Sequence, residues 1–463
     1  MITNNIEIQY LNSCFSNWLQ RDDKQEVNIE KVNLFWFRRD LRLQDNAGLY
    51  HALKSGNPVV PVFIFDKNIL DDLEDEADAR VNFIHDTIHE MQELLLKKDS
   101  TLDVNYGKPI DVFKQLVERY NVDDVFTNHD YEPYARERDE EVGKFLAKND
   151  IGFHTYKDQV IFERNEVIKD DGTPYTVFTP YSKKWLATLT KFYLKSYPAS
   201  KYYRHFFKQS PKKIPSLESM GFKKEEFEFP SSNPRKSIIE QYDKQRDIPG
   251  IPGTSRVGMH LRFGTISIRE LASTAKQLND VYLKELIWRD FYQMIMWHFP
   301  KVGKGHAFRA EYENIEWRND EKEFERWCNG TTGYPIVDAG MRQLNETGFM
   351  HNRIRMVTAS FLSKHLLIDW RWGEAYFAAK LLDYDLASNN GGWQWAAGSG
   401  CDAAPYFRIF NPYRQTERFD KDLKYIREWV PEFEEFTYPK PIVEHETARK
   451  RCLEVYSKAL KKS

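Results

Sequence analysis

The chain has few cysteines and little net charge, and each of these features excludes some classes of protein. Its 463 residues include four cysteines, which lie far apart in the sequence and form no CxxC pair: Cys14, Cys328, Cys401 and Cys452. A disulfide scaffold and a cysteine-rich zinc site are therefore not expected, and the pattern suits a reducing compartment. A net charge of −3 gives no global positive field of the kind that marks many nucleic-acid-binding proteins.

Long apolar segments and common catalytic signatures are missing too. No apolar run reaches the ~18 residues that indicate a membrane-spanning helix, and the start of the chain lacks the charged and apolar regions of a signal peptide. There is no GxGxxG after the first predicted strand, no GxxxxGK(S/T) loop and no nucleophile elbow. We therefore expect a cytoplasmic protein without a membrane partner, and neither ordinary dinucleotide-binding nor hydrolase chemistry.

One pair of histidines has the spacing of metal ligands on a helix. His85 and His89 are four residues apart in a segment with helical periodicity. No glutamate is placed as in HExxH, and no third ligand lies nearby in the sequence. We therefore expect a solvated helix face at these histidines and no bound metal.

Aromatic residues, by contrast, are abundant, at 15% of the chain. A large core explains part of this share, and surfaces that stack on planar ligands are the functional explanation. Between residues 183 and 213, aromatics alternate with nine Lys and Arg residues and no Asp or Glu. This basic tract is either a solvated linker or a surface that follows a phosphate backbone, and the sequence leaves both open.

The first third of the chain alternates strand-like and helix-like patterns. Short apolar runs at residues 32–37 and 59–65 predict buried parallel strands, and residues 102–106 and 124–127 predict two more. Apolar residues at three-to-four spacing over residues 81–95 predict an amphipathic helix that packs on the sheet. This alternation predicts an α/β domain with a doubly wound parallel sheet.

The remainder of the chain loses this alternation. After about residue 231 the helical period dominates, which predicts a mainly α-helical second domain joined to the first by a long linker. We therefore divide the chain into an N-terminal extension with one amphipathic stretch, an α/β domain, a connection that contains the basic tract, and a helical domain: residues 1–30, 31–155, 156–230 and 231–463.

Two short motifs combine arginine with capping residues. The first predicted strand runs into FRRDLRLQDN, residues 37–46, whose arginines and aspartates are typical of a salt-bridged loop with a helix cap. In GTSRVG, residues 253–258, Thr254 and Ser255 supply hydroxyls and N-caps, glycine permits close approach, and Arg256 supplies a fork of donors. Such a turn at the start of a helix could hold a phosphate, although capping boxes have the same composition.

Two predicted helices each place polar and aromatic residues on one face. The face in KELIWRDFY has the spacing i, i+3, i+4 and i+7 and consists of Glu285, Trp288, Arg289 and Tyr292. The face in MHNRIRM consists of Asn352, Arg355 and Met356. A carboxylate, an indole and a guanidinium suit a planar ligand with polar edges, and they equally suit a salt bridge over a tryptophan. Two such faces in one domain favour a site.

The densest stretch of candidate residues covers residues 381–412. Asp383 and Asp385 can accept hydrogen bonds from a ligand or a guanidinium, and they precede the run NNGGWQW, residues 389–395. Two glycines permit a tight turn beside a ring, and two tryptophans offer stacking or electron-transfer partners. We expect a ligand-lined loop here.

The order of these motifs resembles that of the photolyase/cryptochrome family, and most closely that of the class I photolyases that repair cyclobutane pyrimidine dimers. The motifs are FRRDLRLQDN, GTSRVG, ELIWRDFY, MHNRIRM and the 381–412 stretch. The likeness extends from about residue 32 to the C-terminus. It implies an α/β domain linked to a helical domain that holds FAD, ultraviolet-damaged DNA as the partner, and a monomer without an obligate protein partner. Its activity would be electron transfer from photoexcited reduced FAD to a lesion flipped out of the duplex. The alternative is a blue-light-sensing cryptochrome without repair activity.

The resemblance also implies three sets of site residues. The cofactor set is Tyr242, Thr254, Ser255, Arg256, Val257, Gly258, Tyr282, Asn352, Arg355, Asp383, Tyr384, Asp385 and Asn389. The DNA and lesion set is Arg246, Glu285, Trp288, Arg289, Tyr292, Asn352, Arg353, Met356, Trp395, Arg408 and Gln415. The catalytic set is Glu285, Asn352 and Asn389, together with a tryptophan chain that reduces oxidised flavin in light, Trp393, Trp370 and Trp317.

Particular positions separate the members of this family. Asn389 stands where the family places the residue that faces flavin N5, and asparagine there suits a photolyase. Photolyases that repair (6-4) lesions carry histidines at the positions of Asn352 and Met356, so these residues disfavour (6-4) repair. Glu285 and Trp288, with Asn389, favour repair over signalling.

The expected antenna region departs from the family pattern. Folate-binding photolyases carry an Asn-Glu pair near YEPYARERD, residues 131–139, where this chain has Tyr134 and Ala135. The departure argues against a folate antenna, and a deazaflavin, a second flavin or no antenna would all fit.

Overall fold

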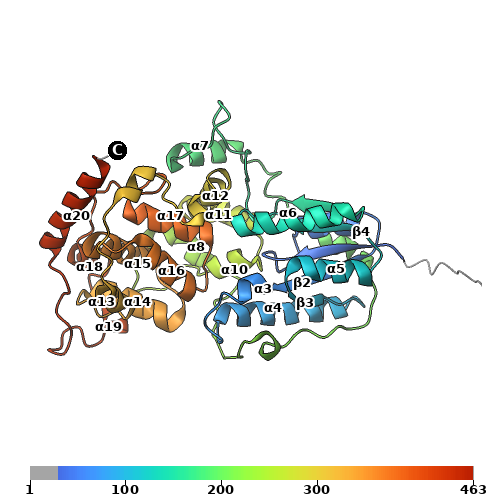
Figure 1. Ribbon diagram of the computed structural model, residues 1–463, viewed down its shortest axis with the longest axis horizontal. Coiled ribbons are helices and arrows are strands. Elements are labelled where there is room, and N and C mark those ends of the chain that lie inside the picture. The colour runs from blue at the N-terminus through green and yellow to red at the C-terminus, as the bar shows by residue number, and fades with distance from the viewer. Residues whose placement is uncertain (1–29, 462–463) are drawn as a thin grey trace, which may run out of the picture.

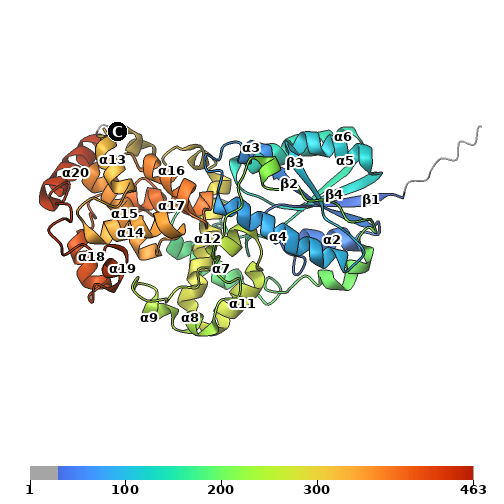
Figure 2. The same ribbon diagram turned by 90° about the horizontal axis from the view of Figure 1, so that it is seen from below.

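The computed structural model describes residues 30–461. The extension predicted for residues 1–30 lies outside the described residues, apart from residue 30. Figures 1 and 2 show two parts, a sheet flanked by helices at one end and a body of helices at the other. In both views α12 (Asp280–His298) lies between the sheet and the more distant helices.

The sheet has five strands in the order β3-β2-β1-β4-β5, and every neighbouring pair is parallel. The strands are β1 (Val32–Phe37), β2 (Val59–Asp66), β3 (Asp103–Gly107), β4 (Val122–Asn128) and β5 (Gly152–Tyr156). The first four coincide closely with the predicted strands, and β5 was not predicted individually.

Helices cover both faces of this sheet because successive side chains of a strand point to opposite sides. Phe35 and Phe37 of β1 pack with residues of α2 (Ala47–Lys54) and α4 (Ala79–Leu96). Trp36, between them, packs instead with residues of α5 (Pro109–Arg119) and α6 (Pro133–Lys148). The predicted doubly wound α/β fold is confirmed.

After β5 the chain first forms α7 (Phe178–Thr188), which packs on α12 of the helical part. It then forms η1 (Ala199–His205), which packs on α2 of the α/β part, and η2 (Glu218–Met220). Within the basic tract, the Phe207 amide donates to the Val59 carbonyl at 2.8 Å, and the Lys212 ammonium bonds Asp103. Val59 and Asp103 begin β2 and β3, so this half of the tract packs on the amino-terminal edge of the sheet. It is neither a solvated linker nor a free phosphate-binding surface.

The helical part follows, and its prediction is also confirmed. It comprises α8 (Lys236–Glu240), α9 (Tyr242–Gln245), α10 (Gly258–Phe263), α11 (Ile268–Leu278), α12, η3 (Val302–Lys304), η4 (Ala310–Asn314), α13 (Glu321–Cys328), α14 (Pro335–Thr347), α15 (Asn352–Ser360), the π-helix η5 (Phe361–Leu366), α16 (Trp370–Lys380), α17 (Leu386–Ala397), α18 (Pro412–Phe419), α19 (Lys424–Trp429) and α20 (His445–Leu460). A further short helix, α3 (Lys67–Leu70), follows β2. Over residues 30–461, none of the helices has both the length and the hydrophobicity to span a bilayer.

The 381–412 stretch corrects one prediction, because its centre is a helix and not a loop. Asp385 caps α17 by accepting from the Ser388 amide at 3.0 Å. A Cβ on Gly391 would lie 2.2 Å from the ring of Tyr292 on α12. This glycine therefore permits close packing of two helices and does not form a turn. The prediction rested on the density of Asn, Gly, Trp and Asp and on the turn that two glycines permit, whereas tertiary packing makes a helix of residues that are poor helix formers.

The prediction of a solvated helix face at the histidine pair was wrong for His85. His85 is buried on α4, where its Nε2 lies 3.2 Å from the Pro215 carbonyl oxygen and its ring contacts His89. Burial lowers the pKa of His85, as expected for an imidazole in apolar surroundings. The face is therefore not solvated at His85. No group of three or more metal-binding side chains occurs among the described residues.

The FRRDLRLQDN segment joins the two parts of the molecule. Asn46 caps α2 by accepting from the Leu49 amide at 3.1 Å, as predicted. Arg39 donates to Asp385 of the helical part at 2.6 Å, and Arg42 donates to the Gly264 carbonyl at 2.9 Å. The segment is thus a capped, salt-bridged loop whose partners lie across the junction.

Asp385 is the charged centre of this junction. Burial alone would raise the pKa of its carboxyl, but the guanidiniums of Arg39, Arg262 and Arg289 hold that pKa well below its usual range. Arg39 also donates to Glu132 at 2.7 Å, within the α/β part. The pairing compensates the cost of burying these charges.

We predict that Arg39→Met will lower the free energy of unfolding by about 3–5 kcal/mol, because it leaves the buried carboxylate of Asp385 without its hydrogen-bonded guanidinium. Urea denaturation measures the change. Lys31→Met, which removes the exposed pair with Asp123, serves as the control and should change the free energy of unfolding far less, because solvent screens an exposed ion pair. A loss for Arg39→Met as small as that of the control would contradict the prediction.

Candidate functional site

A cavity of about 400 Å³ lies in the helical part, and every residue that lines it comes from that part. Its volume is in the range of pockets that hold small ligands and cofactors, about 300–1,000 Å³. The predicted site residues that line it are Arg246, Glu285, Trp288, Arg289, Tyr292, Asn352, Arg353, Arg355, Met356, Asp383, Tyr384, Asp385, Asn389, Trp393 and Trp395.

Five lining residues were not in the predicted site sets, namely Ala359, Phe377, Leu381, Ser388 and Gly392. Leu381, Ser388 and Gly392 lie within the 381–412 stretch that was expected to line a ligand. Ala359 lies one turn after Arg355, so extension of the predicted face on α15 would have found it. Phe377 is a plain apolar residue, and the sequence around it carries no sign of a site.

The face of α12 forms one wall of the cavity. Glu285 accepts a hydrogen bond from Arg246. Burial raises the pKa of Glu285, and the charge of Arg246 opposes this effect. The indole of Trp288 stacks on Phe178 with ring centroids 3.7 Å apart and planes at 3°. One face of this indole is therefore occupied by the protein itself.

The face of α15 forms a second wall. Arg355 donates to both carboxylate oxygens of Asp383, at 2.9 and 3.0 Å, so the predicted pair is present in the structure. Arg353 donates to Asp247 at 2.7 Å and lies over the ring of Phe419. Asn352, at the start of α15, lines the cavity beside them.

Behind Asn389 lies a carboxyl group that the sequence did not indicate. The side-chain amide of Asn389 donates to the backbone carbonyl of Glu374 at 3.1 Å, and that of Asn390 donates to the Glu374 carboxyl at 2.9 Å. Burial raises the pKa of Glu374 to about 7, so this group titrates near neutral pH. The neighbouring Asn389 lines the cavity, which places this titration next to the site.

The GTSRVG turn lies near the cavity but does not have the predicted caps. Val257 is the N-cap of α10 and makes no side-chain cap bond, while the Ser255 hydroxyl lies 2.8 Å from the Tyr282 hydroxyl. Arg256 has a left-handed backbone, with φ of 53°, and its guanidinium lies over the ring of Phe349. The Ser255 hydroxyl and the Arg256 guanidinium thus have partners within the protein. The backbone amides of the turn are a further means of holding a phosphate.

Several predicted residues do not line the cavity. They are Tyr242, the turn residues Thr254, Ser255, Arg256, Val257 and Gly258, and also Tyr282, Trp317, Trp370, Arg408 and Gln415. Gly258 still approaches the cavity wall closely, because a Cβ there would lie 2.7 Å from an oxygen of Asp383. Arg408 is exposed, and its guanidinium lies 5.9 Å from the ring of Trp395.

The predicted antenna region is occupied by the protein's own side chains. The Tyr134 hydroxyl donates to Asp66 at 2.6 Å. The guanidinium of Arg138 lies over the rings of both Tyr134 and Trp36.

The cavity has the features that a flavin ring system requires. The buried Nε1 of Trp393 has no hydrogen-bond partner among the described residues. A Cβ on Gly392 would meet nothing within 4 Å, so space is open above α17 at this point. Two carboxylates, an amide and stacking surfaces surround this space, which suits a planar group with polar edges.

Comparison with known proteins agrees with this reading. Residues 33–201 match the family model described as DNA photolyase, and residues 282–437 match the FAD binding domain of DNA photolyase. The chain is 37% identical to a deoxyribodipyrimidine photo-lyase of Salmonella typhimurium, over 93% of this chain and 99% of the relative.

Solved structures show the same relationship. A class III photolyase from Agrobacterium tumefaciens superposes with a TM-score of 0.81 at 32% identity, over 96% of this chain and 100% of that one. A Synechocystis cryptochrome superposes with a TM-score of 0.80 at 25% identity, over 92% of this chain and 99% of that one.

The fold and the cavity thus define a two-domain FAD-binding flavoprotein. The chain belongs to the photolyase/cryptochrome family, and within it to the DNA photolyase enzymes. The predicted family, enzyme class and FAD cofactor are confirmed.

We predict that Glu374→Gln will flatten the pH dependence of stability. The folded-state pKa of Glu374 is about 7 against an ordinary value of 4.5, so the stability contributed by its protonated form is present at low pH and is lost as pH rises through this window. The melting temperature of the wild-type protein should therefore fall more steeply over this window than that of the variant. Equal slopes would contradict the prediction.

Proposed function

We propose that this protein repairs cyclobutane pyrimidine dimers in DNA by a light-driven electron transfer. One observation carries the proposal: the residues expected to hold the flavin and those expected to hold the lesion line a single cavity. Asp383 and Asn389 of the first group and Glu285 and Trp395 of the second therefore face the same space. The flavin, as electron donor, and the pyrimidine dimer, as electron acceptor, would lie close together there, as direct electron transfer requires.

The flavin would be held by the wall that contains the ion pairs. The Arg355–Asp383 pair would lie beside the isoalloxazine, Asp385 would accept a hydrogen bond from its pyrimidine edge, and Asn389 would face N5. Bound FAD, reduced and photoexcited, supplies the electron that opens the cyclobutane ring. The backbone amides of residues 254–258 would bind its phosphates, with Tyr242 and Tyr282 nearby.

The lesion would enter the same cavity after leaving the duplex. A distorted, poorly paired dimer costs less to extrude than a normal base pair, which supplies part of the selectivity. Trp288 and Trp395 offer stacking faces, each worth about 1–3 kcal/mol per base. Glu285 and Asn352 would hydrogen-bond the flipped bases; burial raises the pKa of Glu285, and the charge of Arg246 opposes this shift.

The identity of two residues in the cavity favours a cyclobutane dimer as substrate. Asn352 and Met356 line the cavity where (6-4) photolyases carry histidines. A signalling cryptochrome is the alternative, and the structural likeness to the Synechocystis cryptochrome supports considering it. Such a protein would bind flavin without removing dimers. The monomeric state, the cytoplasmic location, the domain boundaries and the antenna remain predictions.

Chemically reduced protein, mixed with an ultraviolet-irradiated thymine oligonucleotide, tests the proposal. We expect the dimers to disappear in blue or near-ultraviolet light and to persist in the dark. Persistence of the dimers in the light, with flavin bound, would reject repair and support the cryptochrome alternative.

We predict that Glu285→Ala will weaken binding of dimer-containing DNA by about 1–3 kcal/mol, because a hydrogen-bond partner of the flipped base is lost. Binding to undamaged DNA should change little. Glu140→Ala, at an exposed pair with Lys144 on α6, is the matched control and should leave both affinities unchanged. Titration of fluorescent oligonucleotides measures both, and equal losses for damaged and undamaged DNA would contradict the assigned role.

A further inference from the structure

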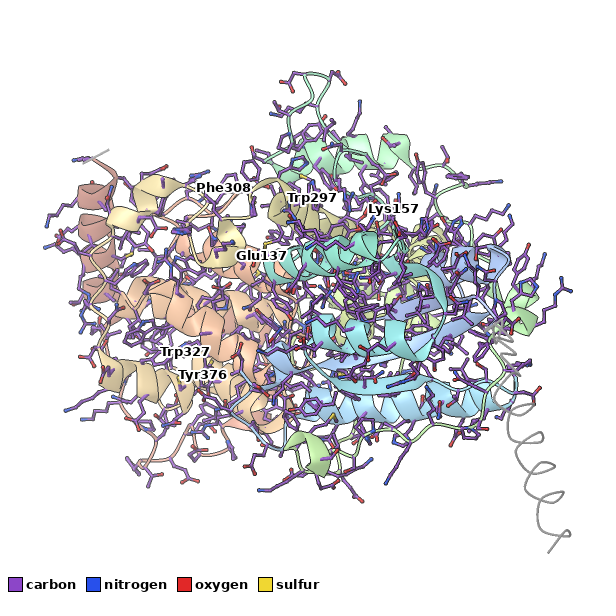
Figure 3. The ribbon with its side chains drawn as sticks, turned by 45° about the vertical axis from the view of Figure 1, so that its right-hand side comes forward. Glu137, Lys157, Trp297, Phe308, Trp327 and Tyr376 are labelled. Carbon is purple, nitrogen blue, oxygen red and sulfur yellow. The ribbon has the colours of Figure 1, made fainter. Side chains whose placement is uncertain are left out.

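A connected set of aromatic rings leads from the cavity to the protein surface by way of α13 and α16. The ring centroids of Trp393, which lines the cavity, and Trp327 are 6.1 Å apart. Trp327 in turn lies 5.7 Å from Tyr376. Figure 3 shows Trp327 and Tyr376 beside each other in the helical part.

The first two rings of this set lie in dry surroundings. Trp393 and Trp327 are 2% and 0% exposed. The close approach of Trp393 to α16 depends on Gly373, because a Cβ there would lie 2.0 Å from the indole. The Trp327 Nε1 donates to the Thr358 carbonyl at 3.2 Å, which is a neutral acceptor and a poor base.

The last ring, Tyr376, differs from the first two because its O–H group lies near the surface, where it can lose a proton to water. Tyr376 is half-buried, and its hydroxyl donates to Asn345 at 2.7 Å at the exposed edge of the cluster. Burial raises the pKa of this phenol to about 12, so it carries its proton at neutral pH. Water at the surface can accept that proton when the phenol is oxidised.

We propose that Trp393, Trp327 and Tyr376 form a second electron-transfer route, separate from the expected chain through Trp370 and Trp317, and that it ends in a tyrosyl radical. The route rests on the proposed function only in that Trp393 is taken as the residue that loses an electron in the light.

Each step moves one electron, and the last step also releases one proton. After Trp393 has lost one electron to the excited oxidised flavin, one electron passes from Trp327 to Trp393, and one from Tyr376 to Trp327. The phenol O–H bond of Tyr376 breaks in the last step, and its proton goes to water. Both indoles are then restored, and a neutral phenoxyl radical remains. An external thiol restores the phenol by donating a hydrogen atom.

Phenylalanine rings surround the same path but cannot replace its members. Phe377 lies 5.0 Å from Trp393, and Phe324 lies 5.8 Å from Trp327. A phenyl ring is much harder to oxidise than an indole or a phenol. Trp372 lies beyond Phe324, at 5.2 Å from it, and is the competing endpoint.

The test is electron paramagnetic resonance of the FAD-loaded, oxidised protein under blue light without DNA or thiol. Trp370→Phe blocks the expected chain and isolates the second route. In that background we expect a radical whose spectrum changes when ring-deuterated tyrosine is incorporated. Tyr376→Phe and Trp327→Phe, each added to Trp370→Phe, should abolish it.

Matched controls keep the two hypotheses separate. Tyr413→Phe and Trp429→Phe remove a tyrosine and a tryptophan outside the route and should leave the signal unchanged. A tyrosyl signal that survives Tyr376→Phe or Trp327→Phe, a tryptophan radical that takes its place, or no protein radical in the Trp370→Phe background would overturn the second route. Dimer repair by chemically reduced wild-type protein is measured separately, so failure of repair and failure of the route give different results.

Discussion

A buried carboxylate at the junction of the two parts is the constraint on which the site depends. One oxygen of Asp385 caps α17, and the other accepts from Arg39 of the α/β part. A buried charge is tolerated only where it is paired and hydrogen-bonded. Every residue that lines the cavity belongs to the helical part, yet the α/β part supplies the guanidinium that holds this wall in place. The helical part therefore lines the site, and the α/β part stabilises one of its walls.

Close packing of helices then gives the cavity its shape. Gly391 on α17 admits the ring of Tyr292, and Gly373 on α16 admits the indole of Trp393. Trp393 is at once part of the largest core cluster of the helical part and part of the cavity wall. Stability and chemistry thus use the same side chains, because the dry surroundings that favour packing also favour electron transfer between aromatic rings.

Two of the predictions that failed share one cause. The 381–412 stretch was expected to form a ligand-lined loop because it is dense in Asn, Gly, Trp and Asp, but the cap by Asp385 and the packing against α12 make residues 386–397 a helix. His85 was expected on a solvated face, and the segment around Pro215 covers it. In both cases the partner lies on a segment that local sequence reasoning does not bring into contact.

The sequence by itself determined four of the five strands, the helical second part, and the faces of α12 and α15, because hydrophobic periodicity is a local property. Family motifs added the pair of Arg355 with Asp383, which the structure contains. Only the tertiary structure decided that Arg39 reaches Asp385 across 346 residues, that Glu374 lies half-buried behind Asn389, and that Trp327 connects Trp393 to Tyr376. These contacts depend on which distant segments meet, and burial at the meeting point sets their charges and their chemistry.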